Sequence, residues 1–496
     1  MLNNTDPFNA STGSDRLASP RYLVILLLVA AMAVFAISRK GLAAGVVLVV
    51  LPFALVFLYN LYKRPVTGFY SAIALGFILL GTGRYLPPGT QVGLVMDAIL
   101  ALTYIGLFLN RFYDRIDWKP ARKDVTLLAF IWFSYSLLEF FNPEMRSRSA
   151  WLAGIRGISL YMMLIIPLVL LFINDRRRLD RFFSLWGIFS VLASIKGIIQ
   201  IVIGPDPFEQ AWLATDAGLT HVIFGNLRAF SFMSDAGQFG ANQAYSAVVA
   251  SILFFAGGSR RRRMFFFTVA LLGFTGMFLS GTRGAISIPL AGFFLFFVLR
   301  KNLYVLISGV VLLALVFIFF KFTYVGQGNQ FIRRMRTAFN PNDPSLQVRL
   351  ENQKKLQAYL ATRPFGGGIG HAGVKAKSYM PETYLSNIAT DSWYVLIWAE
   401  QGIVGLLLHL FILFYILIKA SLIIMFRIRD PELKLKMSAL ASGMIGVMVA
   451  SYGNAVLGTL PTSLLIYSSM AIMLNAKALD VPEPATDDAS TKNAVP

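Results

Sequence analysis

Charged residues stand at several places where long hydrophobic segments of the sequence begin or end. Arg228 and Arg283 each adjoin such a segment, and Asp391 opens a third. Arg349 lies in the polar stretch between the last two of these positions. A guanidinium carries a permanent charge on a planar fork of N–H donors, whereas a carboxylate accepts protons. Taken singly, such residues usually cap helices or reach toward water, but their joint placement favours a functional site.

Motifs for metal binding and nucleophilic catalysis are missing from the sequence. The three histidines, His221, His371 and His409, do not have the spacing of metal ligands, and neither G-x-S-x-G nor H-E-x-x-H occurs. Cysteine is absent, which excludes disulfides and thiolate chemistry. The glycine run at 366–370 lacks the Lys-Ser/Thr of a phosphate loop, so we interpret it as a tight turn. The sequence therefore predicts no metal site and no cofactor.

The composition indicates that lipid surrounds much of the chain. Of the 496 residues, 56% are hydrophobic and only 14% are charged, and the mean hydropathy is +0.63. So little polar surface cannot coat a water-soluble globule, and the hydrophobic runs do not alternate as barrel strands do. We predict an all-α, polytopic transmembrane helical bundle. The net charge of +20 comes without any nucleic-acid-binding motif, and we expect no nucleic-acid partner.

Fourteen segments approach the roughly 20 apolar residues that a membrane-spanning helix needs, and because several are short we expect about 12–14 spans. In the first half they cover residues 21–38, 42–62, 66–83, 92–109, 125–141, 157–174 and 183–204. In the second half they cover residues 241–256, 265–280, 285–299, 303–321, 392–420, 437–457 and 460–476.

Lysine and arginine in short loops predict the orientation, because such loops remain in the cytoplasm. Each basic cluster follows an even-numbered segment, which places both termini in the cytoplasm. The clusters are Lys63-Arg64, Arg111 to Lys123, Arg176 to Arg181, Arg260 to Arg263, Arg300-Lys301 and Arg427 to Lys436.

This orientation divides the chain into tails, membrane segments and two long periplasmic loops. The predicted parts are a cytoplasmic tail at 1–20, transmembrane helices at 21–204, a loop at 205–240, transmembrane helices at 241–323, a large loop at 324–391, transmembrane helices at 392–476 and a disordered cytoplasmic tail at 477–496. Loops of this length are usually functional.

The larger loop is predicted to contain an amphipathic helix. Asp343 is a suitable N-cap, Pro344 fits the first helical position, and apolar residues recur at helical spacing until Pro364 and the glycines end the pattern. Such a helix lies either on the membrane surface or against the bundle, and the sequence leaves both positions open.

Three motifs resemble the O-antigen ligase and O-antigen polymerase (Wzy-type) superfamily of bacterial membrane glycosyltransferases. They are Ser-Gly-Thr-Arg-Gly-Ala at 280–285, Arg349 followed by Pro-Phe-Gly-Gly-Gly-Ile-Gly at 364–370, and Ala-Glu-Gln-Gly-Ile-Val-Gly-Leu at 399–406. The likeness covers about residues 225–460, whereas the N-terminal half is similar only in being hydrophobic.

The resemblance implies a metal-independent, inverting glycosyltransferase of the GT-C type that uses an undecaprenyl-diphosphate-linked glycan. It implies an inner-membrane protein whose site faces the periplasm, where Arg228, Arg283 and Arg349 hold the diphosphate. A guanidinium matches phosphate oxygens and stabilises the leaving diphosphate. The implied acceptor is a further glycan, lipid A-core or a protein.

One residue departs from the ligase pattern. Family ligases carry a proposed catalytic histidine nine residues before the glutamate that corresponds to Glu400, and Asp391 occupies that position here. A carboxylate can take the acceptor proton, so Asp391 is a candidate base, and His371 is a second one. The missing histidine favours a polymerase slightly, and the choice between polymerase and ligase stays open. The alternative class is a transporter or flippase of lipid-linked glycans, although no internal repeat supports it.

Overall fold

The structure is a computed structural model that describes residue 38 and residues 42–87, 89–110, 117–223, 225–340 and 342–480. Several sequence predictions lie outside the described residues. These are the N-terminal tail, all but the last residue of the span at 21–38, the basic residues Arg111 and Arg115, and the C-terminal tail beyond residue 480.

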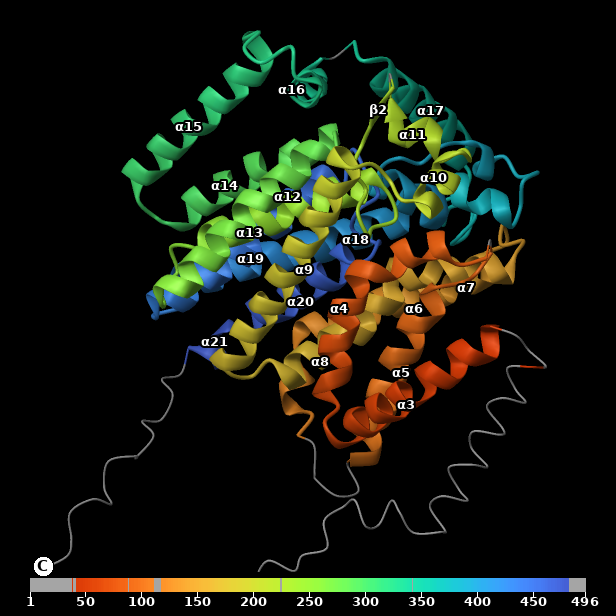
Figure 1. Cartoon of the computed structure of the whole chain (residues 1–496), viewed down its shortest axis with the longest axis horizontal. Coiled ribbons are helices and arrows are strands. Elements are labelled where there is room, and N and C mark those ends of the chain that lie inside the picture. The colour runs from red at the N-terminus through yellow and green to blue at the C-terminus, as the bar shows by residue number, and fades with distance from the viewer. Residues whose placement is uncertain are drawn as a thin grey trace, which may run out of the picture. The chain divides into compact units, whose positions relative to one another are not determined.

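Helices make up nearly all of the regular structure in the described residues, which confirms the predicted all-α class (Figure 1). In the first half they are α3 (Leu42–Lys63), α4 (Val66–Thr82), α5 (Gly93–Asn110), α6 (Asp124–Leu138), α7 (Arg148–Ile155), α8 (Tyr161–Phe172), α9 (Arg176–Val202), α10 (Pro207–Leu213) and α11 (Gly218–His221). In the second half they are α12 (Ala236–Leu253), α13 (Arg260–Leu279), α14 (Ser287–Leu299), α15 (Leu303–Phe322), α16 (Gln330–Arg336), α17 (Pro344–Leu360), α18 (Trp393–Phe426), α19 (Pro431–Ala450), α20 (Thr462–Leu474) and α21 (Ala476–Leu479). Two short antiparallel strands, β1 (Val222–Ile223) and β2 (Asn226–Leu227), lie between α11 and α12.

Eight helices in the described part of the chain are long and apolar enough to cross a membrane, and four shorter apolar helices accompany them. Helix α15 shows most clearly that lipid must surround the protein. Its mean hydropathy reaches 2.9, yet Gly309 and Phe320 are its only buried residues. Exposing the rest of this helix to water would be costly, so the chain is a multi-pass membrane protein.

Two compact units divide the described chain. The first contains residues 42–67 and 103–110, and the second contains residues 68–102 and everything described from residue 117 onward. All of the candidate site residues belong to the second unit.

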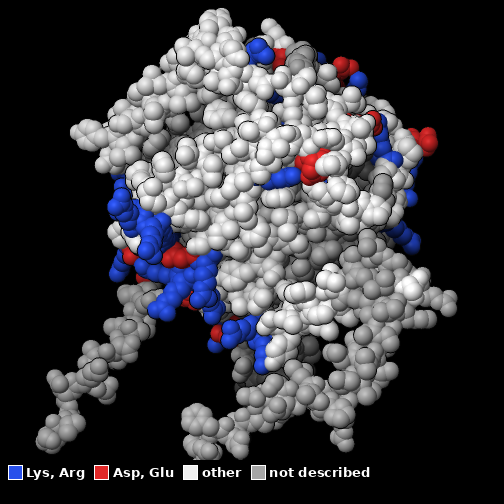
Figure 2. Space-filling model, viewed as in Figure 1, with Lys and Arg blue, Asp and Glu red and all other residues white. Residues whose placement is uncertain are grey.

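Within the second unit, helices α9, α13 and α19 begin side by side. Arg262 of α13 lies 2.9 Å from the carboxylate of Asp180 on α9 and 3.1 Å from that of Glu432 on α19. The buried amine of Lys436 lies 2.7 Å from each of the same carboxylates. Figure 2 shows basic side chains gathered at this edge of a broad face that carries few charges.

The segments predicted as long loops lie at the other end of these helices. In Figure 1, α10, α11, α16 and α17 gather there, opposite α21. The predicted helix is α17, which begins at Pro344, with the side chain of Asp343 accepting the N–H of Leu346 at 3.3 Å. Leu356 and Leu360 of α17 are buried against Ala399 of α18. Of the two positions that the sequence left open, the structure therefore shows packing against the bundle.

Candidate functional site

The segment 364–370, which contains the glycine run at 366–370, contacts a break in helix α18. Gly402 interrupts this helix with φ 64° and ψ −167°, a conformation that a side chain disfavours. The N–H groups of Gly367 and Gly368 donate to the carbonyls of Ala399 and Glu400, at 2.9 Å each. The structure confirms the predicted turn. It also shows that two of the family-like motifs form one local unit, which positions the loop beside the start of α18.

His371 follows this turn, and its surroundings argue against a role as the catalytic base. The imidazole is buried, and its Nε2 accepts the backbone N–H groups of Arg146 and Ser147 at 2.9 and 3.1 Å. Because Nδ1 lies 2.8 Å from the carbonyl of Ile369, it must donate. Burial lowers the pKa of His371, which favours the neutral ring. Both nitrogens are therefore occupied in hydrogen bonds to the backbone, which favours a structural role for His371.

Arg228 and Arg283 meet at one cavity of about 530 Å³, here called the arginine cavity. Arg333 and Arg334 of α16 also line it. Asp343 is the one carboxylate among the described residues that line it, and it is hydrogen-bonded to Arg283. Four guanidiniums therefore surround a space with one carboxylate in its wall.

Neutral oxygen atoms orient two of these guanidiniums. Arg228 donates to the carbonyls of Ser280 and Thr220, at 3.0 and 2.7 Å, and to the hydroxyl of Thr282 at 3.0 Å. Arg334 donates to the carbonyl of Gly281 at 2.5 Å. These contacts fix the direction of the guanidiniums without placing a negative charge on them.

The pKa values of Arg228 and Arg334 are lowered in part by neighbouring guanidiniums. Burial, followed by the nearby guanidinium of Arg334, lowers the pKa of Arg228 to about 10, against the opposing effect of Asp235 and with a smaller contribution from Arg283. Burial and then Arg283 also lower the pKa of Arg334. Cations that destabilise one another favour a bound anion, which would relieve their repulsion.

A second cavity, of about 440 Å³, adjoins the same arginine and is here called the carboxylate cavity. Asp235 and Asp391 line it together with Arg228 and Arg349. The guanidinium of Arg349 lies 3.2 Å from the carboxylate of Asp391, which orients this acid. Because Arg228 lines both cavities, the structure brings Arg228, Arg283, Arg349 and Asp391 into one continuous region, as their placement in the sequence predicted.

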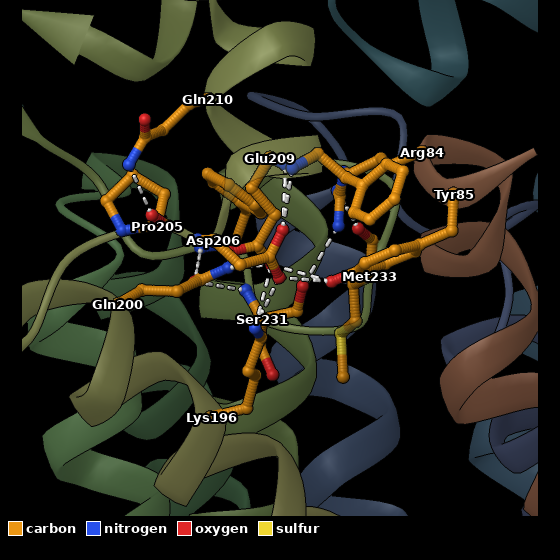
Figure 3. Close-up of polar contacts among 12 residues, drawn as sticks. Arg84, Tyr85, Lys196, Gln200, Pro205, Asp206, Glu209, Gln210, Ser231 and Met233 are labelled. Atoms are coloured by element: carbon orange, nitrogen blue, oxygen red, sulfur yellow. Dashed lines mark hydrogen bonds and ion pairs between the residues drawn. The ribbon is translucent and has the colours of Figure 1, made fainter.

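The segment that carries Arg228 is clamped by Arg84, which follows α4 in the turn Gly83–Tyr85 (Figure 3). The guanidinium of Arg84 donates to the carbonyls of Ser231 and Met233, and lies 4.4 Å from the ring centres of Trp212 and Phe230. Such stacking adds a cation–π attraction to the hydrogen bonds. Arg84 therefore holds the backbone between Arg228 and α12.

A polar network on α9 and α10 supports the same segment (Figure 3). The side-chain oxygen of Gln200 accepts the N–H groups of Phe230 and Ser231 at 3.1 and 2.8 Å, and its amide nitrogen donates to Glu209 at 2.8 Å. Glu209 also lies 3.1 Å from the amine of Lys196. These polar groups are satisfied by one another, so the network is structural.

Sequence reasoning missed Arg84 and Asp235, although both carry the signal that selected Arg228. Each is a charged residue next to the end of a long hydrophobic segment, and Asp235 caps α12 by accepting the N–H of Gln238 at 2.9 Å. Arg333 and Arg334 carried no such signal, because nothing in the loop sequence indicates that α16 turns toward Arg283.

Fold and site together define a multi-pass helical membrane protein with two adjoining polar cavities at one end of its helices. Residues 268–410 match the family model for O-antigen ligase. The match supports membership of the O-antigen ligase and polymerase family, and it confirms the resemblance seen in the motifs. It includes Arg283, Arg349 and Asp391, whereas Arg228 lies outside it. No curated protein matches the chain.

Proposed function

We propose that this protein is a glycosyltransferase that takes a glycan from an undecaprenyl-diphosphate carrier and joins it to an acceptor hydroxyl. The observation that carries the proposal is the arginine cavity, where four guanidiniums face a space bounded by one described carboxylate. A diphosphate supplies the missing negative charge, and guanidiniums match its oxygens through paired hydrogen bonds.

In this mechanism, the arginine cavity binds the diphosphate and the carboxylate cavity holds the base. Arg228 and Arg283 hold the diphosphate, and Asp391 takes the proton of the acceptor hydroxyl. The hydroxyl oxygen forms a bond to the anomeric carbon of the donor sugar. The bond from this carbon to the diphosphate breaks on the opposite side, with inversion, and the electron pair leaves with the diphosphate. The guanidiniums stabilise the charge that develops there, so the proposed step assigns this task to the protein rather than to a metal.

Arg349 has a supporting part in the proposal. Its ion pair with Asp391 places it beside the base, and it lines the carboxylate cavity only. We therefore assign it to orienting Asp391, in place of the diphosphate contact that the resemblance implied.

We propose further that the site faces the periplasm across the inner membrane. Basic residues at the starts of α9, α13 and α19 share one end of the helices, and such residues mark the cytoplasmic side. The loops at 205–240 and 324–391 would then be periplasmic. Both a polymerase and a ligase fit this arrangement.

The test uses purified protein in liposomes supplied with a lipid-linked oligosaccharide. We expect release of undecaprenyl diphosphate, and we expect Arg283→Ala to abolish it because a donor to the diphosphate is lost. Arg263→Ala is the matched control, since Arg263 is an exposed arginine at the start of α13, outside both cavities. Unchanged turnover in Arg283→Ala would remove this arginine from the site. Movement of the lipid across the membrane without change in its linkage would indicate a flippase.

A further inference from the structure

Gln238 lines the carboxylate cavity and carries a hydrogen-bond acceptor that the described residues leave unpaired. This residue of α12 is 5% exposed, and its amide nitrogen donates to the carbonyl of Ala455 at 2.9 Å. Its Oε1 is buried and finds no partner among the described residues. A buried acceptor left without a donor costs free energy, so its position at a cavity indicates a ligand that donates a hydrogen bond.

Asn454 is a second amide residue in the wall of the carboxylate cavity. Its Nδ2 is 2.6 Å from the place where a Cβ on Gly284 would lie, next to Arg283. No hydrogen bond of its side-chain amide is found within the described part of the chain. A primary amide offers both donors and an acceptor. Asn454 can therefore bind a group that both donates and accepts hydrogen bonds.

Other polar side chains of this cavity can also bind hydroxyl groups. Thr220, Thr390 and Thr459 contribute hydroxyl groups, and Asp235 and Asp391 contribute carboxylates. His221, Arg228 and Arg349 complete its polar lining. Sugar hydroxyls donate and accept together, and amides, hydroxyls and carboxylates match them. The arginine cavity differs because its wall is dominated by cations.

We propose that the carboxylate cavity binds the sugar of the lipid-linked glycan through Gln238 and Asn454, while the arginine cavity binds the diphosphate. The inference rests on the proposed function and deepens it by assigning sugar and diphosphate to separate cavities. Arg228, which lines both, then lies beside the bond that breaks. The acceptor hydroxyl lies on the side of Asp391.

The sequence contains no cysteine, which makes thiol labelling a direct test. Asn454→Cys reports on the carboxylate cavity and Arg333→Cys on the arginine cavity. Each variant is reconstituted in liposomes and labelled with a maleimide, with no ligand, with undecaprenyl diphosphate, or with undecaprenyl-diphosphate-linked oligosaccharide from cells that make it. Arg263→Cys, at the other end of the helices, controls for effects on the reagent.

We expect both lipids to protect Arg333→Cys, whereas only the oligosaccharide-bearing lipid protects Asn454→Cys. At about ten times the Kd, occupancy slows labelling by roughly tenfold. Equal protection of Asn454→Cys by undecaprenyl diphosphate would overturn the division into two cavities. Protection of Arg333→Cys alone, by either lipid, would overturn the sugar assignment and leave the proposed function standing. No protection at either position by either lipid would contradict the proposed function itself.

Thr459→Cys is the second reporter should Asn454→Cys fail to fold, because Thr459 lines the same cavity and is partly exposed. A complementary measurement compares KM values. Gln238→Leu keeps the size of the side chain and removes its polar groups. It should raise the KM for the lipid-linked oligosaccharide by roughly tenfold and leave the affinity for undecaprenyl diphosphate unchanged. An unchanged KM for this oligosaccharide would count against the sugar assignment.

Discussion

The two ends of helices α9, α13 and α19 hold cations in different ways. Where the helices begin, Arg262 and Lys436 share the carboxylates of Asp180 and Glu432, at distances of 2.7 to 3.1 Å. At the opposite end, Arg228 and Arg334 are oriented by carbonyl and hydroxyl oxygens. The cations of the first group are paired with carboxylates of the protein, whereas the second group carries an excess of positive charge.

This difference separates a structural cluster from a binding site made of the same residue types. A paired cluster needs nothing further, and its removal affects stability. Burial lowers the pKa of Arg228 and of Arg334, and a neighbouring guanidinium lowers each further, Arg334 at Arg228 and Arg283 at Arg334. A bound anion would relieve this repulsion. Substitutions at one end at a time therefore separate binding from stability.

The largest effect is expected for Asp391→Asn. An amide cannot take the proton of the acceptor hydroxyl, so turnover should fall by about 10²–10⁴-fold. Binding of undecaprenyl diphosphate should remain, because Asp391 does not line the arginine cavity. Single-turnover kinetics and a binding assay on the same preparation check both statements. Loss of binding together with turnover would show that this residue serves the fold.

Arg228→Lys is expected to have the next largest effect. Lysine keeps the charge but loses the planar fork that contacts both cavities and three neighbouring oxygens. We expect turnover to fall by about 10²-fold or more, with weaker binding of the diphosphate lipid. Arg333→Lys serves as the comparison, because Arg333 is exposed and lines the arginine cavity only. Equal effects of the two substitutions would contradict the special position of Arg228.

Lys436→Met should change stability and leave chemistry intact. The substitution removes a buried amine that lies 2.7 Å from two partly exposed carboxylates, which should lower the free energy of unfolding by about 1.5–3 kcal/mol. Thermal unfolding in detergent measures the loss. Lys434→Met, on the same turn of α19, is the control. Reduced turnover per folded molecule in Lys436→Met would contradict the assignment of this end of the helices to stability alone.

The smallest effect is expected from pH. The pKa of Arg228 is lowered only to about 10, so this guanidinium stays charged throughout the neutral range. Affinity for undecaprenyl diphosphate should change by less than about twofold between pH 7 and roughly pH 8.5, and should fall as the pH nears 10, where Arg228 loses its proton. Titration of binding against pH checks this, and an affinity that falls steeply near neutral pH would point to a histidine instead.

The sequence predicted the membrane class, helix α17 and the grouping of Arg228, Arg283 and Asp391, because all of these depend on local patterns. Hydrophobic length indicates spans, and charges at the ends of spans indicate a common face. The basic residues that begin α9, α13 and α19 also gather at one end, as the charge pattern required.

Contacts between distant parts of the chain could not be predicted in the same way. The backbone contacts of His371 were not foreseen, because its partners, the N–H groups of Arg146 and Ser147, lie more than 200 positions away. The clamp formed by Arg84 joins residues about 150 positions apart. The sequence identifies such side chains as polar and gives no indication of what they contact.

Direct binding of undecaprenyl diphosphate tests the central claim, that surplus guanidiniums at one end of the helices bind a diphosphate. The lipid is titrated into protein in nanodiscs, with the wild-type chain compared with Arg228→Gln, Arg283→Gln and the exposed control Arg263→Gln. We expect each cavity substitution to weaken binding by roughly tenfold or more, while the control binds as the wild type does. Equal affinity in all four proteins would contradict this claim.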